Sequence, residues 1–168
     1  MHSHKPGVEI ERRFLIALPD EAFLEGAQCS QITQTYLTAP EGTTERVRRR
    51  VYAERVVCTH TVKRRIGGIA REEREREISQ QEYEALSLRA DKQRRVIEKS
   101  RYCLEYKGQL LEIDIYPFWN DRAILEIELD DEEEAVFLPP ELRVVKEISL
   151  DKRYTNSALA LSVPEDEL

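Results

Sequence analysis

The stretch from Val8 to Ile16 reads V-E-I-E-R-R-F-L-I and places charged residues where they could do chemistry. Because side chains in a β-strand alternate between two faces, Glu9, Glu11 and Arg13 would share one face and apolar side chains the other. Carboxylates are ligands for hard cations such as Mg²⁺ and Mn²⁺, and a guanidinium binds phosphate oxygens. The charged row could therefore line a site, or it could simply face water, since an antiparallel sheet often buries one face only.

Similar rows recur along the chain with the same alternating spacing. They are Arg46, Arg48 and Arg50; Thr61 and Lys63; Arg71, Glu73, Glu75 and Glu77; Lys99 and Arg101; Glu112 and Asp114; Glu126 and Glu128. Like charges on neighbouring positions of a sheet repel, so such rows need a compensating ligand. Paired carboxylates together with basic rows fit a metal-bound polyphosphate. The charge rows alone leave a charged site and a solvated face equally open.

The elements that carry these rows are mainly strands. Period-two patterning predicts about eight strands, at residues 8–16, 34–38, 45–52, 57–63, 71–78, 96–104, 109–116 and 123–129. A shorter strand is expected near residues 144–148. Turn residues separate most neighbours, so sequential antiparallel pairing is the simplest topology. If the charged rows face inward, the sheet closes into a barrel whose apolar outer faces need cover from helices or from a second copy of the chain.

Helices interrupt this pattern. They are expected at residues 20–27, 79–89 and 131–138, and a small apolar helix is expected from Asn156 onward. The clearest one begins at Ser79, which forms a capping box with Glu82. The predicted fold class is α+β, with one domain over residues 1–168 and a disordered N-terminus at residues 1–7.

Composition restricts the class of protein. With 33 acidic and 26 basic residues, the net charge is −7, which argues against a general nucleic-acid binder. Three cysteines without a C-x-x-C pair indicate neither a disulfide framework nor a zinc site and suit a reducing cytoplasm. No apolar run approaches the roughly 20 residues of a membrane helix, and the N-terminus lacks the apolar segment of a signal peptide. We expect a cytoplasmic protein that binds neither nucleic acid nor membrane, with a homodimer as one way to cover its apolar faces.

The charged motifs, taken in order, resemble those of the CYTH superfamily, also called triphosphate tunnel metalloenzymes. The E-I-E-R-R-F-L of residues 9–15 is similar to the family signature E-x-E-x-K, with Arg13 at the position of the signature lysine. The other matching motifs are Q-T-Y-L at 34–37, R-V-R at 46–48, T-V-K at 61–63, R-E-E-R-E at 71–75, E-K-S-R-Y at 98–102, E-I-D-I at 112–115, E-I-E at 126–128 and D-K-R-Y at 151–154. The chain resembles the short bacterial inorganic triphosphatases most.

This resemblance implies a fold, a reaction and a set of site residues. The fold would be a closed antiparallel barrel of about eight strands, a triphosphate tunnel with a charged interior and peripheral helices. The reaction would be metal-dependent hydrolysis of inorganic triphosphate to pyrophosphate and phosphate. The implied ligands of Mg²⁺ or Mn²⁺ are Glu9, Glu11, Glu73, Asp114, Glu126 and Glu128. The implied substrate-binding residues are Arg13, Arg46, Arg48, Lys63, Arg71, Lys99, Arg101 and Lys152. The implied catalytic residues are Lys99, Lys152, Tyr36 and Glu75.

Other functions stay open at this point. Relatives within the superfamily cleave thiamine triphosphate or cyclise ATP, although the chain has no clear aromatic pair beside its basic rows to recognise a base. Phe118 and Trp119 are more typical of core packing or cover. A non-catalytic polyphosphate- or nucleotide-binding module is a second alternative, supported by Arg13 at the signature position. A structural domain with solvated charges is a third, and it would bind neither anions nor Mn²⁺ tightly.

Single residues also have two interpretations. Tyr36 would face the tunnel near the substrate or would supply a structural hydroxyl to a polar network. Lys152 would close over a phosphate from the C-terminal segment. Arg153 and Tyr154 are expected to dock that segment onto the barrel.

Overall fold

A computed structural model describes residues 7–168 of the chain. The strands are β1 (Val8–Ala17), β2 (Gln28–Leu37), β3 (Thr43–Val51), β4 (Val56–Gly67), β5 (Ala70–Ile78), β6 (Ile97–Tyr106), β7 (Gln109–Ile115), β8 (Arg122–Glu128) and β9 (Val144–Glu147). The helices are α1 (Glu21–Leu24), α2 (Gln80–Ser87), the 3-10 turn η1 (Lys152–Tyr154) and α3 (Asn156–Leu159). Each strand predicted from the alternating pattern is present.

The expected disordered terminus falls mostly outside the described residues. Residues 1–6 are not described, but Gly7 is, and its carbonyl accepts a hydrogen bond from the Glu73 amide at 2.7 Å. Disorder of the N-terminus therefore stays a prediction.

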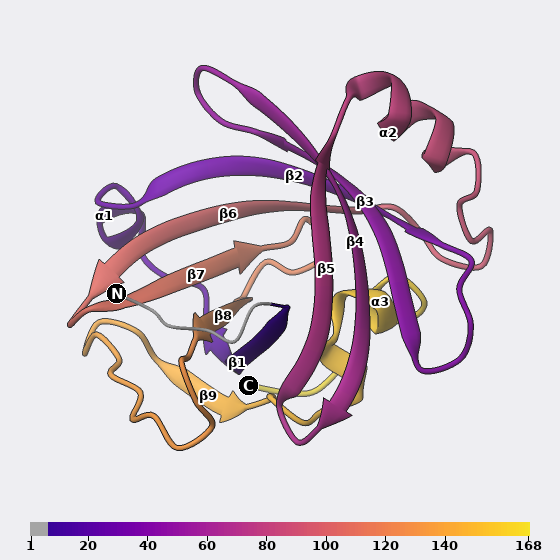
Figure 1. Cartoon of the computed structure of the whole chain (residues 1–168). Coiled ribbons are helices and arrows are strands. Elements are labelled where there is room, and N and C mark those ends of the chain that lie inside the picture. Colours follow the sequence, from indigo (N-terminus) through magenta and orange to yellow (C-terminus); the bar gives the residue numbers. More distant parts are fainter. Residues whose placement is uncertain (1–6) are drawn as a thin grey trace.

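The sheet closes on itself (Figure 1). Its strand order is β5-β4-β3-β2-β6-β7-β8-β1-β9, and an additional pairing of β5 with β1 joins all strands except β9 into a ring. The predicted closed antiparallel barrel is confirmed. Purely sequential pairing is wrong, because β2 pairs with β6, and β1 pairs with β8 and β5 instead of β2. Inserting β1 between β8 and β5 removes the two free edges that a sequential sheet would leave exposed.

One edge of β1 is divided between two partners. Val8–Ile10 pairs with β5, and Phe14–Ile16 pairs with β9. Between these stretches the backbone of Arg13 bonds to the segment after β9. Its amide donates to Ser149 Oγ at 2.9 Å, and its carbonyl accepts from the Ile148 amide at 2.8 Å. The C-terminal segment therefore completes the barrel wall where β5 leaves β1.

The main apolar core lies outside the barrel, as inward-facing charges require. One buried cluster covers the outer faces of β1, β7 and β8 and consists of Phe14, Ile16, Leu111, Ile113, Ala123, Leu125, Ile127, Leu129 and Leu142. Side chains of α1 and of residues 136–138 pack against this cluster. A second cluster joins β2 to β5 under α2, through Tyr83 and Leu86. Peripheral elements thus cover the apolar faces, and the homodimer stays a prediction.

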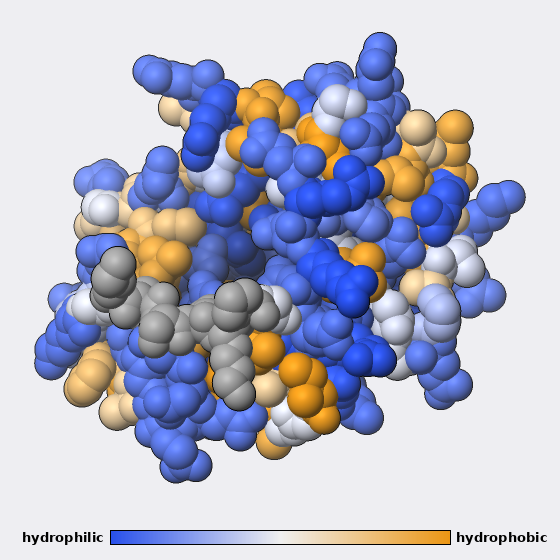
Figure 2. Space-filling view, in the orientation of Figure 1, coloured by the Kyte–Doolittle hydropathy of each residue, from blue (hydrophilic) through white to orange (hydrophobic). Residues whose placement is uncertain are grey.

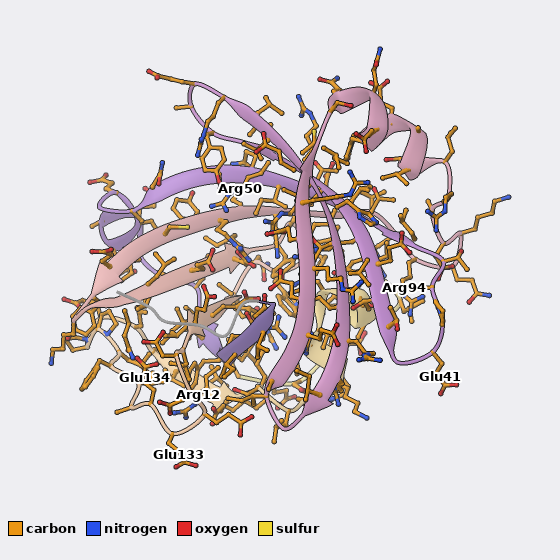
Figure 3. All side chains as sticks on the ribbon, in the orientation of Figure 1. Arg12, Glu41, Arg50, Arg94, Glu133 and Glu134 are labelled. Atoms are coloured by element: carbon orange, nitrogen blue, oxygen red, sulfur yellow. The ribbon has the colours of Figure 1, made fainter. Side chains whose placement is uncertain are left out.

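Residues 131–138 form turns and irregular chain, so the helix predicted there is wrong. Glu133 and Glu134 lie in this loop below β9 (Figure 3). Acidic side chains hydrogen-bond the local backbone instead: Glu134 Oε2 accepts from the Asp130 amide at 2.6 Å, and Asp131 Oδ1 accepts from the Glu133 amide at 2.8 Å. Such bonds favour turns over helix.

The other helices are shorter than their patterns predict. Helix α1 spans only Glu21–Leu24, and α2 spans Gln80–Ser87. At the start of α2, Ser79 Oγ accepts from the Glu82 amide at 3.1 Å, which is half of the predicted capping box. The Glu82 carboxylate instead pairs with Arg76 at 2.9 Å. Within residues 7–168, no helix combines the length and apolarity needed to cross a bilayer.

The position of the core outside the barrel predicts unequal effects for two identical substitutions. Leu125 on the outer face of β8 is 0% exposed, whereas Leu88 after α2 is 89% exposed. Leu125→Ala should lower the free energy of unfolding by about 2–5 kcal/mol. Leu88→Ala should change it by less than about 0.5 kcal/mol. Urea denaturation of both variants measures the difference, and equal losses would contradict this placement of the core.

Candidate active site

The barrel encloses a cavity of about 750 Å³. The space-filling view shows a hollow with a hydrophilic surface on this face of the molecule (Figure 2). The charged residues that line the cavity include Glu9, Glu11, Arg13, Arg46, Arg48, Arg50, Lys63, Arg71, Glu73, Glu75, Lys99, Arg101, Glu112, Glu126, Glu128 and Lys152. Tyr36 lines it as well. Every residue with a predicted site role except Asp114 therefore borders one space, which favours a charged site over a solvated face.

The wall formed by β3 and β4 is basic. Arg46 and Arg48 project inward from β3, and the Nε atoms of both are buried without a hydrogen-bond partner. Burial lowers the pKa of Arg48 to about 10, and repulsion from Arg46 and Arg101 acts in the same direction. Arg48 approaches one acid, Glu75, at 3.7 Å. Buried donors without partners require an acceptor, and phosphate oxygens match guanidinium geometry.

The wall formed by β1 and β8 is acidic. Glu11 lies directly opposite Glu128 in the antiparallel register, and both line the cavity. Burial, together with the charges of Glu126 and Glu9, raises the pKa of Glu11 to about 8. Like charges directly across a strand pair destabilise a sheet unless a cation lies between them.

This acidic wall fits a divalent cation that a substrate completes. Among residues 7–168, no group of three or more His, Cys, Asp or Glu side chains is arranged to hold a metal ion alone. Mg²⁺ commonly takes one or two carboxylates and fills its other positions with water and phosphate oxygens. Glu11 and Glu128 supply such a pair of oxygen donors beside the basic wall.

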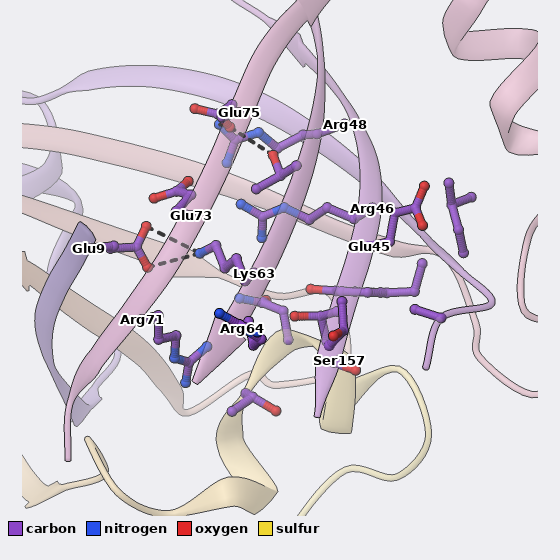
Figure 4. Close-up of a pocket in the computed structure, with 18 of the residues that line it drawn as sticks. Glu9, Glu45, Arg46, Arg48, Lys63, Arg64, Arg71, Glu73, Glu75 and Ser157 are labelled. Carbon is purple, nitrogen blue, oxygen red and sulfur yellow. Dashed lines mark hydrogen bonds and ion pairs between the residues drawn. The ribbon is translucent and has the colours of Figure 1, made fainter. Parts of the chain in front are cut away.

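A third group joins the two walls where β1 meets β5 (Figure 4). Lys63 Nζ donates to the two carboxylate oxygens of Glu9 at 2.9 and 3.2 Å. Burial opposes ionisation of Glu9, but Lys63 and a hydrogen bond with Glu73 bring its pKa below the ordinary value. Burial and the hydrogen bond with Glu9 raise the pKa of Glu73 to about 8. Glu73 therefore keeps a proton near neutral pH, while Glu9 is ionised and opposite Arg71 in the register.

Asp114 lies behind this surface, and it alone of the predicted site residues does not line the cavity. It is 0% exposed and accepts hydrogen bonds from Arg101 Nε at 2.7 Å and Nη2 at 2.8 Å. Lys99 Nζ lies 2.8 Å from its Oδ2. Burial would raise the pKa of Asp114, but Arg101 and Lys99 hold it well below the ordinary value. Both oxygens of Asp114 are bound by Lys99 or Arg101, so Asp114 orients these two side chains.

Lys99, like Arg48, is an inward cation whose pKa is strongly lowered. Burial lowers its pKa to about 8, although the attraction of Asp114 opposes this shift. Its Nζ also donates to Asn156 Oδ1 at 3.3 Å, and Tyr116 OH donates to the same oxygen at 2.6 Å. Asn156 lines the cavity, and sequence reasoning missed it. Its only signal is a polar residue at the start of an apolar C-terminal helix.

Tyr36 and Arg13 both line the cavity and are both buried against other protein groups. Tyr36 is 6% exposed, belongs to an apolar cluster with Leu15 and Tyr116, and accepts from Gln34 Nε2 at 3.3 Å. Arg13 is 4% exposed and donates from Nε to Glu126 Oε1 at 3.2 Å and from Nη1 to the Tyr154 carbonyl at 2.8 Å. Its Nη2 is buried without a partner. Arg13 therefore binds protein groups through Nε and Nη1, and its Nη2 is left without a protein partner.

A closed antiparallel barrel with facing basic and acidic walls defines the class of triphosphate tunnel proteins. No protein-family model matches the chain. The inorganic triphosphatase of Nitrosomonas europaea is 34% identical over 93% of this chain and 99% of the relative. That of Acetivibrio thermocellus is 35% identical over 91% of this chain and 93% of the relative. The chain belongs to the inorganic triphosphatase family of the CYTH superfamily.

Solved structures agree with this assignment. The crystal structure of an inorganic triphosphatase matches with a TM-score of 0.59 at 31% identity, over 96% of this chain and 99% of the other. A protein of Pyrococcus horikoshii matches with a TM-score of 0.55 at 21% identity, over 73% of this chain and 80% of the other, which shows the shared fold alone.

The raised pKa of Glu11 predicts a pH effect on stability in the presence of a chelator. The folded protein keeps this carboxyl protonated up to about pH 8, whereas the ordinary value is 4.5. Between these limits the folded state binds more protons, so the contribution of Glu11 to stability is complete below pH 4.5 and is lost as pH rises through 8. Glu11→Gln should raise the free energy of unfolding at pH 8.5 by about 1–3 kcal/mol and leave it unchanged near pH 4.

Urea denaturation across this pH range measures the effect. Glu77→Gln on the exposed end of β5 is the matched control and should leave the pH dependence unchanged. Parallel pH curves for wild type and Glu11→Gln would contradict the raised pKa.

Proposed function

We propose that this protein hydrolyses inorganic triphosphate to pyrophosphate and phosphate, with Mg²⁺ or Mn²⁺ as cofactor. The observation that supports this most is the division of the cavity into a basic wall with unpaired guanidinium atoms and an acidic wall with paired carboxylates. A basic wall alone would fit any polyanion. The acidic wall would repel a free anion, so it is explained best by a cation that accompanies the phosphates.

The basic residues would bind and orient the phosphate chain. Arg46, Arg48 and Lys63 come from adjacent strands of one wall, and Lys99 and Arg101 come from β6. Phosphoryl transfer depends mainly on positioning and on neutralising charge, which fixed cations supply without reorganisation. Arg71, Arg13 Nη2 and Lys152 would add contacts at the edges of the same space.

The acidic residues would hold the cation. Glu11 and Glu128 are the proposed direct ligands, and Glu126, the ionised Glu9 and the protonated Glu73 would complete the site through water or substrate. When bound, the cation would neutralise phosphate charge and make a coordinated water more acidic. Because Glu11 holds a proton in the metal-free protein, binding a cation there would release it.

The remaining residues would manage protons. Lys99, whose pKa is about 8, is still mainly protonated at neutral pH and is held by Asp114. We assign it, with Lys152, to neutralising the developing charge of the leaving pyrophosphate. Glu75 accepts from Thr61 Oγ1 at 2.9 Å and lines the cavity, which supports assigning it to accept a proton from the attacking water. Tyr36, which also lines the cavity, would orient the phosphates.

An organic triphosphate is supported less well. Phe118 stacks on Tyr116 with ring centroids 5.0 Å apart, and Trp119 meets the same ring at 5.5 Å. Both aromatic side chains are therefore committed to packing, and neither lines the cavity. Thiamine triphosphate and ATP remain comparison substrates for the test.

Rapid phosphate release should occur with inorganic triphosphate and Mg²⁺ or Mn²⁺, and not with chelator. Arg48→Gln should lower kcat/KM for triphosphate at least about a hundredfold, because it removes a buried charge from the phosphate site. Arg49→Gln on the opposite face of β3 is the matched control and should retain activity. Release from pyrophosphate, ATP and thiamine triphosphate should be much slower, and no release from any of these compounds would contradict a hydrolase.

The acidic wall can be tested separately from the phosphate site. Glu128→Gln should raise the Mn²⁺ concentration for half-maximal activity about tenfold or more, since one charged ligand is removed. Arg48→Gln should leave this concentration within about threefold of wild type where its activity can be measured. Titration of Mn²⁺ into each protein without substrate gives an independent affinity, and unchanged affinity in Glu128→Gln would exclude that residue as a ligand.

A further inference from the structure

The 3-10 turn η1 follows the segment that hydrogen-bonds Arg13 of β1 beyond the end of the β5 pairing. It carries Lys152 to the cavity, and Thr155 and Asn156, which follow it, line the same space. In Figure 1 the helix α3, which follows this turn, is seen between the lower parts of β3 and β4. Lys152 itself is exposed and belongs to a turn of only three residues. Its position therefore depends on what holds the turn on each side.

The inner side of the turn is held from within the barrel. Arg13 Nη1 donates to the Tyr154 carbonyl at 2.8 Å, and Asp151 Oδ1 accepts from the Arg153 amide at 3.1 Å. The Tyr154 side chain is 0% exposed and packs in the cluster that includes Leu15. This side of the turn is thus joined to the residue at the signature position of β1.

The outer side is held by one carboxylate near the end of the chain. Asp166 Oδ2 accepts from Tyr154 OH at 2.5 Å, from Arg153 Nη2 at 3.0 Å and from Lys146 Nζ at 2.9 Å. Its other oxygen accepts from Arg153 Nη1 at 3.2 Å. The backbone carbonyl of Asp166 accepts from Arg122 Nη1 at 2.5 Å. The pKa of Asp166 lies below its ordinary value, because Tyr154, Lys146 and Arg153 bind its charged form.

We propose that Asp166 is a positioning residue, which fixes η1 through Tyr154 and Arg153 so that Lys152 faces the cavity. The C-terminal tail then forms part of the tunnel wall. Asp166 joins it to β9 through a hydrogen bond from Lys146 and to β8 through one from Arg122. The role of Lys152 toward phosphate rests on the proposed function, whereas the anchoring of η1 does not. None of the hydrogen-bond partners given above for Asp166 lines the cavity, and the cavity-lining residues nearest to them in the chain are Lys152 and Thr155 on either side of Arg153 and Tyr154. We therefore expect the effect of Asp166 on substrate to pass through η1.

Two readouts follow η1 without any enzyme assay. Trp119, the only tryptophan of the chain, lies with its ring centroid 6.2 Å from that of Tyr154, so its fluorescence reports the position of the turn. Trypsin cleavage after Lys152 or Arg153 reports whether the turn can leave the wall. Asp166→Ala should shift Trp119 emission and increase cleavage at these bonds by about tenfold or more. Asp166→Glu should restore most of the protection, because it restores the charge.

The functional effect should depend on Lys152. Asp166→Ala should lower kcat/KM for triphosphate about tenfold, mainly through KM, but less than about twofold in a Lys152→Ala background. Glu82→Ala, which removes an exposed ion pair between α2 and Arg76, is the matched control and should leave both readouts unchanged. Melting temperatures of all variants show whether the barrel stays folded.

The outcomes separate the two proposals. If wild type binds triphosphate without hydrolysing it, the proposed function fails, and affinities from calorimetry replace kcat/KM in the same set of variants. Unchanged Trp119 emission and trypsin protection in Asp166→Ala would overturn the positioning role. A loss of the same size with and without Lys152 would overturn it as well, because the effect would then not pass through that residue.

Discussion

A fully buried carboxylate, Asp114, orients two cations inside the barrel, and the charged cavity depends on this interaction. Taking Lys99 and Arg101 out of water is unfavourable, and their mutual repulsion adds to it. The two oxygens of Asp114 accept from both residues, so β6 can present a lysine and an arginine to the cavity in fixed positions. Removing the carboxylate would leave Lys99 buried without an acid partner, whereas Arg101 would keep Glu112 and Glu126. Breaking a buried ion pair in this way costs about 3–5 kcal/mol in comparable sites.

Charges inside force the apolar side chains outside. On β1, β7 and β8 the residues that alternate with the inward charges are apolar, and they need cover that a closed sheet does not supply by itself. The cover comes from α2 on one side and from α1 with the irregular segment after β8 on another. Loops and short helices therefore carry core packing in this protein, and the barrel interior contributes little to it except at the end closed by Tyr36, Tyr116 and Tyr154.

Local patterns predicted the strands and the inward rows because alternation is a local property of a strand. The pairing of β2 with β6 and of β1 with β5 was not predictable in this way, because it depends on how the whole sheet closes. The family resemblance implied Asp114 as a metal ligand, and its burial behind Arg101 has no sequence signal. The turn after β8 was mistaken for a helix because acidic residues favour both helix starts and backbone-bonding turns. Asp166 was missed because its partners are far apart in sequence.

Arginine at the signature position of β1 fits this architecture. A lysine ammonium is a compact charge, whereas the planar guanidinium directs donors to several sides at once. Arg13 uses this geometry to bind Glu126 on the acidic wall and the Tyr154 carbonyl in η1, and Nη2 still points to a buried space without a protein partner. One side chain thus links the acidic wall to the segment that closes the barrel. A lysine would have to use one ammonium group for both Glu126 and the Tyr154 carbonyl. Arginine uses Nε for the first and Nη1 for the second, so Nη2 is still without a protein partner.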